Sequence, residues 1–380
     1  MPSRKTALLV STVCRQFFLF ERSNIELLKA QGCEVHCAAD FSEHDSRLDS
    51  LGVVQHHVSF DRSPFSPKNI GALLAVKKLI RTLQPDLIHC HSPMGGVVSR
   101  LASWSEKNRK PVLYTAHGFH FFKGAPLLNW LFYFPVEVVL SRTTDCIITI
   151  NKEDYRRAKS FGTCQVAYVP GVGIDIAGLR RSEHKSDARR SLGIRDGQLV
   201  VLMVGEFIKR KNHRLALDAF ANALQDDWLL LFCGKGVLQD ELQRHANELG
   251  IGSRVRFLGY RSDVNRVMAA SDVYIFPSHQ EGLPVSVMEA MAMGLPVICS
   301  RVRGNIELID DSRGGFLVEA GDVHGFSRAL GQLADSCQLR QTMGSYNQEK
   351  AADFDVSKVE ASMEALYRSY LGGQPAESCS

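Results

Sequence analysis

Residues 278–300, SHQEGLPVSVMEAMAMGLPVICS, decide how this chain folds. The apolar run VYIFP just before them and PVICS near their end are typical of buried strands. Pro284 suits the first turn of a helix, because proline has no N–H to leave unpaired and its φ is already helical. Gly294 suits the position just past the end of that helix. The stretch therefore predicts a strand, a tight loop, a short helix and a second strand.

Two carboxylates flank the start of the predicted helix. Glu281 precedes Gly282 and Leu283 in the loop, and Glu289 lies about two turns further on. Backbone N–H groups at a helix N-terminus lack partners within the helix, and the helix dipole favours an anion there. The amides of Gly282 and Leu283 therefore suit a phosphate, and the carboxylates suit hydroxyls at both ends of a ligand such as a nucleotide sugar. The alternative is a surface loop leading into an amphipathic helix with two solvated carboxylates.

The two glutamates, with seven residues between them, resemble the E-x7-E signature of the retaining glycosyltransferases of family 4. These enzymes have two Rossmann-like domains that face a cleft, the GT-B fold. The resemblance implies that Glu281 lies beside the transferred sugar and has a catalytic role. It also implies that Glu289 binds the ribose of the donor, and that Gly282 and Leu283 hold its diphosphate.

Length and composition agree with an α/β protein of two domains. The chain has 380 residues, 45% of them hydrophobic and 23% charged, which is typical of a soluble globular protein too long for one core. Its ten cysteines form no CxxC pair and several lie in apolar runs, which predicts reduced thiols in the cytoplasm. The early run TALLVSTV is read as a first strand rather than a signal peptide. No run approaches the roughly 18 apolar residues of a membrane span.

The charge is unevenly distributed along the chain. Residues 1–165 carry 21 Lys and Arg against 14 Asp and Glu, a net of +7, and the remainder carries 24 against 27, a net of −3. The basic half indicates either an anionic partner, such as a phospholipid surface or a lipid diphosphate, or ordinary surface variation. Nucleic acid is not favoured, because the sequence has no recognition motif for it.

Short apolar runs alternate with helical patterns through both halves, which is the strand–helix alternation of two doubly wound parallel sheets. We expect an acceptor-side Rossmann-like domain over 1–168, a linker over 169–178 and a nucleotide-sugar-binding Rossmann-like domain over 179–355. A C-terminal helix over 356–372 is expected to return toward the first domain, and 373–380 is expected to be a disordered tail. Ligands of such sheets bind beyond the carboxyl ends of the strands.

The segment MVGEFIKRKN follows a predicted strand of the second half. It is similar to the family motif G-R-x-x-x-x-K-G, whose cations neutralise the nucleotide diphosphate. Gly205 and Lys211 match this motif, but Glu206 stands in place of the arginine and Asn212 in place of the second glycine. The resemblance implies a catalytic role for Lys211, with Lys209 as a substitute second cation. The alternative is a solvated run of charges that opens a helix.

Two weaker signals of a donor site follow in the second half. Gly234 and Gly236 come after a strand, where glycines let a backbone approach a ligand closely, and they resemble the family's GxG turn beside the nucleotide. Tyr260 follows Gly259, at the place where family members pack a residue on the nucleobase. Tyr260 is either such a stacking residue or a plain core or surface tyrosine.

Histidines mark the strand ends of the first half. His117 precedes Gly118 after a predicted strand, and in related transferases the matching histidine contacts the donor sugar or the acceptor. We therefore assign His117 to the catalytic centre, with His120 and His91 on the acceptor side. The pair His89 and His91 also suggests a metal, but the sequence offers no third ligand. Because GT-B enzymes generally need no divalent metal, we expect neither metal nor cofactor.

The block 119–142, FHFFKGAPLLNWLFYFPVEVVLSR, is dense in aromatic and aliphatic residues. Trp130, Phe132, Tyr133 and Phe134 either contact a membrane interface or a polyprenyl chain, or they are buried against the sheet. With the ITINKEDY segment that follows, the block resembles bacterial exopolysaccharide and capsule glycosyltransferases. Their acceptors are often sugars on undecaprenyl diphosphate.

The resemblance implies one function. The chain is expected to be a metal-independent, retaining hexosyl- or N-acetylhexosaminyltransferase that moves a sugar from a nucleotide sugar, by resemblance a UDP-sugar, to a lipid-linked saccharide of a surface polysaccharide. We expect it in the cytoplasm, either free or peripheral on the inner face of the cell membrane. The alternatives are a GT-B epimerase or hydrolase of nucleotide sugars, and a non-catalytic partner subunit that binds them.

Overall fold

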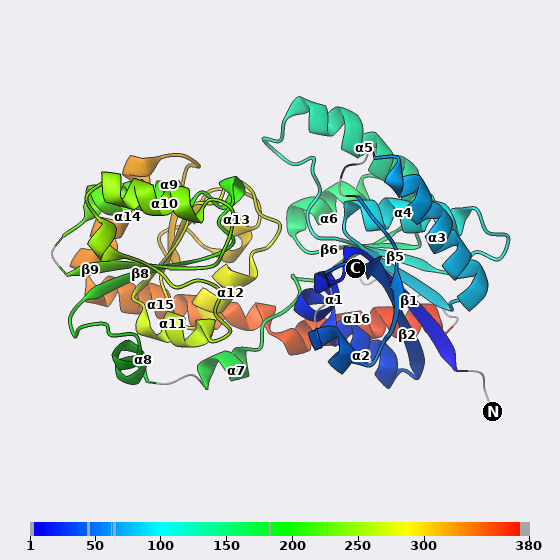
Figure 1. Ribbon diagram of the computed structural model, residues 1–380, viewed down its shortest axis with the longest axis horizontal. Helices are drawn as coiled ribbons and strands as arrows, with labels where there is room; N and C mark the ends of the chain where they lie inside the picture. The colour runs from blue at the N-terminus through cyan, green and yellow to red at the C-terminus, as the bar shows by residue number, and fades with distance from the viewer. Residues whose placement is uncertain are drawn as a thin grey trace. The chain divides into compact units, whose positions relative to one another are not determined.

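The computed structural model describes residues 4–43, 46–61, 63, 66–181, 184–225 and 227–372 (Figure 1). The predicted disordered tail, 373–380, lies outside the described residues. The chain divides into two compact units. The first unit contains Met1–Val172 and Ser357–Ser380, and the second contains Gly173–Val356.

The first unit is built on a parallel sheet of seven strands in the order β3-β2-β1-β4-β5-β6-β7. Consecutive strands are joined by helices, as parallel pairing requires. The strands are β1 (Lys5–Val13), β2 (Cys33–Asp40), β3 (Val54–His57), β4 (Leu87–His91), β5 (Val112–Ala116), β6 (Cys146–Thr149) and β7 (Gln165–Tyr168). The helices are α1 (Arg15–Phe20), α2 (Arg22–Ala30), the 3₁₀ turn η1 (Ser46–Leu51), α3 (Lys68–Leu83), α4 (Pro93–Trp104), α5 (Leu127–Ser141), α6 (Lys152–Lys159) and α16 (Val356–Leu371).

Side chains of β1 alternate between two cores, one on each face of this sheet. Leu8 and Val10 pack in the core beneath α3 and α4, and Leu9 packs in the opposite core with residues of α1, α2 and α16. Figure 1 shows α16, at the red end of the colour scale, beside α2. Gln31, which follows α2, donates from Nε2 to the carbonyl oxygen of Glu364 in α16 (3.2 Å). The last described helix is therefore an integral layer of the first unit.

The second unit is built on a six-stranded parallel sheet in the order β10-β9-β8-β11-β12-β13. Figure 1 shows α9, α10 and α14 on one face of this sheet and α11 and α12 on the other. The strands are β8 (Leu199–Val204), β9 (Trp228–Cys233), β10 (Val255–Phe257), β11 (Val273–Phe276), β12 (Val297–Ser300) and β13 (Gly315–Val318). The helices are α7 (Ile176–Arg180), α8 (Lys185–Ser191), η2 (Lys209–Lys211), α9 (His213–Ala223), α10 (Gln239–Glu248), η3 (Gly252–Arg254), α11 (Val264–Ala270), α12 (Val285–Ala292), α13 (Asn305–Leu308), α14 (Val323–Asp335), α15 (Cys337–Ala351) and η4 (Ala352–Phe354).

The expected two doubly wound α/β halves are confirmed, and so is the strand–loop–helix–strand reading of 278–300. One detail of that reading is wrong. Pro284 is the N-cap of α12, with an extended ψ of 117°, and the helix begins at the next residue. Gly294 lies just past the helix end with φ of +76°, as expected. The short helix α1 directly after β1 was not expected.

Two further expectations concern the cysteines, which were expected to be reduced thiols, and membrane-spanning helices, of which none was expected. The nine cysteines within the described ranges are free thiols, and most of them are buried. Among the described residues, no helix combines the length and the apolar character needed to cross a bilayer.

Candidate active site

In the second unit, the predicted donor residues gather where the strand order reverses. Strands β8 and β11 pair at the centre of the sheet, and the chain continues from β8 toward one edge and from β11 toward the other. Gly205 directly follows β8, and the loop that contains Glu281 follows β11. In open α/β sheets, ligands bind at such a switch point, beyond the carboxyl ends of the strands.

Two of the three predicted catalytic residues, Lys211 and Glu281, are in direct contact. Lys211 Nζ lies 2.8 Å from Glu281 Oε1, and Arg210 Nη1 lies 3.0 Å from the same oxygen. The side chains of Lys211 and Glu281 are only 14% and 6% exposed. Burial, opposed by the charge of Glu281, lowers the pKa of Lys211. Two cations therefore share one carboxylate, and the charge of Glu206 also acts on Lys211. Ammonium and guanidinium groups of this kind are the usual partners of a phosphate.

The loop that carries Glu281 is held by its backbone. Arg303 Nε donates to the carbonyl oxygen of Glu281 (3.3 Å), and the backbone N–H of His279 donates to the carbonyl oxygen of Arg210 (2.9 Å). Gly304, with φ of +83°, packs so closely that a Cβ there would lie 2.5 Å from the carbonyl oxygen of Gly282. The carboxylate is thus fixed in place before any ligand binds.

The second glutamate of the motif, Glu289, has a different environment. It lies within α12, and burial raises its pKa to about 7. Its charge acts on the phenol of Tyr274, whose pKa is raised mainly by burial, and Tyr274 Oη donates to the carbonyl oxygen of Val204 (3.3 Å).

The structure gives a packing reason for the glycines of this edge. A Cβ on Gly234, which has φ of +154°, would lie 1.9 Å from the carbonyl oxygen of Gly205. A Cβ on Gly236 would lie 2.5 Å from the carbonyl oxygen of Phe207. The turn after β9 thus lies directly against the loop after β8. Gly205 itself has room for a Cβ, which would meet the aliphatic part of Lys211 at 3.7 Å.

The remaining predicted donor residues are dispersed around this edge. Glu206 and Lys209 are exposed. Tyr260 is 62% exposed, so it is not a core tyrosine. Gly282 and Leu283 lie in the loop between Glu281 and α12. Of the three consecutive cations, the structure places Arg210 and Lys211 on Glu281, whereas sequence reasoning had selected Lys209 with Lys211.

In the first unit, His91 and His117 meet around a carboxylate that sequence reasoning did not identify. Glu21 Oε1 lies 3.1 Å from His91 Nδ1 and 3.6 Å from His117 Nε2. Gln16 Nε2 donates to Glu21 Oε1 (3.0 Å) and lies 3.2 Å from His117 Nε2. Asn24 Nδ2 donates to the other oxygen of Glu21 (2.7 Å).

Burial keeps the imidazoles of this cluster neutral. It lowers the pKa of His91 to about 3 and that of His117 to about 4. His91 is fully buried, whereas the His117 side chain is partly exposed. Behind them, His89 bonds to Tyr367 Oη through Nδ1 (2.8 Å) and to Thr115 Oγ1 through Nε2 (2.7 Å). The cluster therefore presents one accessible, uncharged imidazole on a fixed support.

Glu21 also supplies a third potential metal ligand beside His91 and His117, which the sequence did not reveal. One atom each of Glu21, His91 and His117 lies within 4.8 Å of the others. Ligands of a tetrahedral zinc ion lie about 3.3 Å apart, so the spacing is compatible with a cation. The hydrogen bonds of Gln16 to two of these groups also account for the spacing without an ion.

Glu21 and Gln16 carry no local signal in the sequence. They belong to the short stretch RQFFLFE after β1, 96 residues before His117. Only the pairing of β1 with β4, and of β4 with β5, brings these segments together. His120 lies outside the cluster and stacks on Tyr133, with ring centroids 4.6 Å apart.

Comparison with known proteins agrees with both halves of this description. Residues 184–350 match the family of glycosyl transferases group 1, and residues 7–151 match the glycosyl transferase 4-like family. The chain is 35% identical over 376 residues to EpsD of Bacillus subtilis (strain 168), which is named as a glycosyltransferase, with 97% of each chain covered.

Two further matches extend the comparison. The chain is 28% identical over 277 residues to the Escherichia coli UDP-Gal:alpha-D-GlcNAc-diphosphoundecaprenol alpha-1,3-galactosyltransferase, covering 70% of this chain and 71% of that one. Among solved structures, HepE of Anabaena in complex with UDP and glucose superposes with a TM-score of 0.79 at 22% identity. The match covers 96% of this chain and 100% of HepE, and it concerns the fold.

Proposed function

This chain belongs to the family 4 glycosyltransferases with the GT-B fold, and from this premise we propose that it is a retaining enzyme that uses a UDP-sugar donor. The proposed acceptor is a saccharide on a polyprenyl diphosphate, in the synthesis of a surface polysaccharide. One observation carries the donor half of the proposal: Lys211 and Arg210 share Glu281 at the switch point of the second sheet. The E. coli galactosyltransferase, whose name gives UDP-Gal as its donor, supports the choice of uridine.

The proposed roles of these residues follow from their charges and from the positions of their polar atoms. In the transition state, the bond between the anomeric carbon and the diphosphate oxygen breaks, and negative charge develops on the departing UDP. Lys211 and the amides of Gly282 and Leu283 stabilise that charge, because a buried ammonium interacts strongly with an anion. Glu281 orients the sugar hydroxyls, and Glu289 accepts hydrogen bonds from the ribose.

The acceptor hydroxyl forms the new bond on the face that the diphosphate leaves. Its proton passes to the departing phosphate oxygen, so the step needs no protein base. His117, neutral because of its lowered pKa, then serves to position reacting hydroxyls rather than to carry charge. The reaction as proposed uses no metal ion.

The lipid-linked acceptor is supported by a relative and by the surface of the first unit. The E. coli galactosyltransferase acts, by its name, on a sugar linked to diphosphoundecaprenol. Helix α5 exposes several large apolar side chains. Such a surface suits an enzyme that works peripherally on the inner face of the membrane, where a lipid acceptor is held.

A transfer assay tests this function. The purified chain is incubated with radiolabelled UDP-glucose, UDP-galactose or UDP-N-acetylglucosamine and a lipid extract that contains polyprenyl-diphosphate saccharides. We expect the label to enter the lipid fraction from one donor, in an α linkage if that donor is α-linked, and Lys211→Ala to abolish the transfer. Release of free sugar, or epimerisation of the donor, without any labelled lipid would contradict the proposal and favour a hydrolase or an epimerase.

A further inference from the structure

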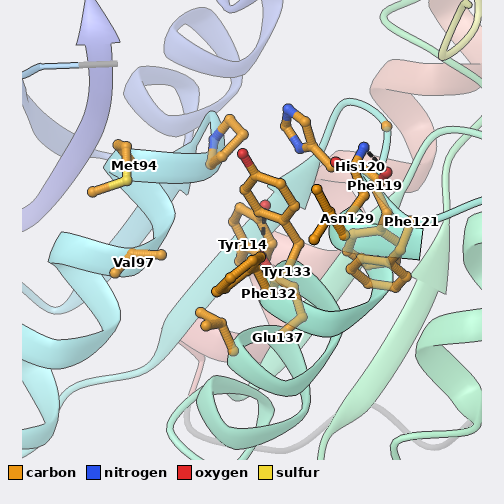
Figure 2. Close-up of a pocket in the computed structure, with 14 residues that line it drawn as sticks. Met94, Val97, Tyr114, Phe119, His120, Phe121, Asn129, Phe132, Tyr133 and Glu137 are labelled. Carbon is orange, nitrogen blue, oxygen red and sulfur yellow. Dashed lines mark hydrogen bonds between the residues drawn. The ribbon is translucent and has the colours of Figure 1, made fainter. Parts of the chain in front are cut away.

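The first unit contains an apolar groove between α4 and α5, with a cavity of about 280 Å³. Figure 2 shows Met94 and Val97 of α4 on one side, with Phe132 and Tyr133 of α5 opposite them. Tyr114 of β5 also lines the cavity. The groove thus has walls from two helices and one strand of the same unit.

The interior charge beneath this groove is neutralised. Arg100 Nη1 donates to Glu137 Oε2 (2.7 Å) and Arg100 Nη2 to Glu137 Oε1 (3.1 Å), a buried two-bond pair. The guanidinium also lies over the ring of Tyr114, 4.0 Å from its centroid. Glu137 is the only charged residue of α5. The groove is therefore available to an uncharged, apolar ligand.

The exposed face of α5 is divided into two apolar rows. Leu128, Phe132 and Val136, spaced four residues apart, line the groove. A second row, consisting of Leu127, Leu131 and Val139, is also exposed but does not belong to the groove lining. Trp130 and Phe134 instead pack against Phe121, so the aromatic residues of this block are only in part surface residues.

One end of the groove is lined by Gly118 and His120. A ligand that fills the groove can therefore present a polar end to His120 and extend an apolar tail along α5.

We propose that this groove binds the first isoprene units of the acceptor's polyprenyl chain, with the diphosphate toward His120. The inference rests on the proposed function, because it names the site for the lipid part of that acceptor. A chain of this kind is long and uncharged, and its burial against Phe132 and Val97 removes apolar surface from water on both partners. A flat bilayer surface would instead use both rows of α5 equally.

Direct binding tests the proposal. Farnesyl diphosphate serves as the probe and inorganic pyrophosphate as the matched probe without a chain, both measured by calorimetry on the full chain. We expect wild type to bind farnesyl diphosphate at least tenfold more tightly than pyrophosphate. Phe132→Asp should weaken farnesyl diphosphate binding at least tenfold. Leu131→Asp, on the same helix and 61% exposed against 55% for Phe132, should change it less than twofold.

Three results would overturn the proposal. Equal affinity of wild type for the two probes would mean that the chain contributes nothing. An equal loss in Phe132→Asp and Leu131→Asp would assign the apolar face to a bilayer. A wild-type dimer that Phe132→Asp dissociates, measured by light scattering, would assign the groove to a second copy of the chain.

Failure of this inference is separable from failure of the proposed function. The increase in melting temperature with UDP depends on residues of the second unit and is measured on the same proteins. A normal UDP effect without farnesyl diphosphate binding removes the groove proposal and leaves the donor proposal intact. Farnesyl diphosphate binding without any increase in melting temperature with UDP removes the donor proposal and leaves the groove proposal intact. A melting curve and a far-UV circular dichroism spectrum of ligand-free Phe132→Asp that match those of wild type show that this variant is folded.

Discussion

The carboxyl ends of the two sheets present opposite chemistry. In the second unit, Arg210 and Lys211 converge on the largely buried carboxylate of Glu281. In the first unit, His91 and His117 converge on Glu21 and are neutral, because burial lowers the pKa of both. The same architecture thus supports a charged edge suited to a diphosphate and an uncharged edge suited to hydroxyl groups. The difference comes from side chains, since both edges use parallel strands in the same way.

The largest effect is expected at the charged edge. Lys211→Ala should lower kcat for sugar transfer by about 10²–10³-fold, as for the loss of one donor that stabilises a developing anion. The matched control is Lys209→Ala, since Lys209 is exposed and lies two residues before Lys211. Steady-state kinetics with the labelled donor measure both variants. Equal losses in the two would mean that general positive charge matters rather than the contact with Glu281.

A smaller effect is expected at the neutral edge. His117→Ala should lower kcat/KM for the acceptor by about 10–100-fold, the cost of one or two lost hydrogen bonds. It should leave the UDP-induced increase in melting temperature unchanged, because His117 belongs to the first unit. Glu21→Gln keeps the shape of the support but removes its charge, and it should give an intermediate loss. A loss of UDP binding in His117→Ala would contradict the assignment of UDP binding to the second unit and of acceptor binding to the first.

Glu289 predicts a pH dependence of stability. Its pKa is raised from 4.5 to about 7 in the folded state, so the folded state binds the proton more tightly. The resulting stabilisation is complete below pH 4.5 and is lost as the pH rises through 7. Glu289→Gln should therefore match wild type near pH 4.5 and exceed it by about 1–3 kcal/mol at pH 8. Melting temperatures at the two pH values measure this, and a difference independent of pH would contradict the assigned burial effect.

The smallest effect is expected from chelation. If Glu21, His91 and His117 form a hydrogen-bonded support, treatment with EDTA should change neither the transfer rate nor the melting temperature. Adding zinc afterwards should also leave the transfer rate unchanged. A rate that falls with EDTA and returns with zinc, and that Glu21→Gln makes insensitive to both, would instead assign a metal to the neutral edge.

The two edges also differ in how far the sequence predicts them. The charged edge is built from short segments, so the sequence pattern alone places Lys211 after β8 and Glu281 after β11, at the same edge of the sheet. Even there, the choice between Lys209 and Arg210 depends on the turn η2, which directs Arg210 toward Glu281. A pattern of consecutive charges cannot specify that direction.

The histidine edge depends on contacts between distant segments. His117 and His91 stand out as residues at strand ends, but Glu21 joins them only through the order of the strands. The block 119–142 shows the same limit. Its composition indicates an apolar surface or a core, and only the rotation of α5 shows that Phe132 is exposed while Phe134 packs against Phe121.

The most direct test of the central claim is the melting temperature of wild type and Glu289→Ala with UDP, GDP, ADP and dTDP. The account predicts that UDP stabilises wild type, by about 2.7 kcal/mol at 100 times its Kd, and that Glu289→Ala abolishes this effect. GDP, ADP and dTDP should stabilise wild type less. No stabilisation by any nucleotide, or the same stabilisation in wild type and Glu289→Ala, would contradict a donor site at the charged edge of the second unit.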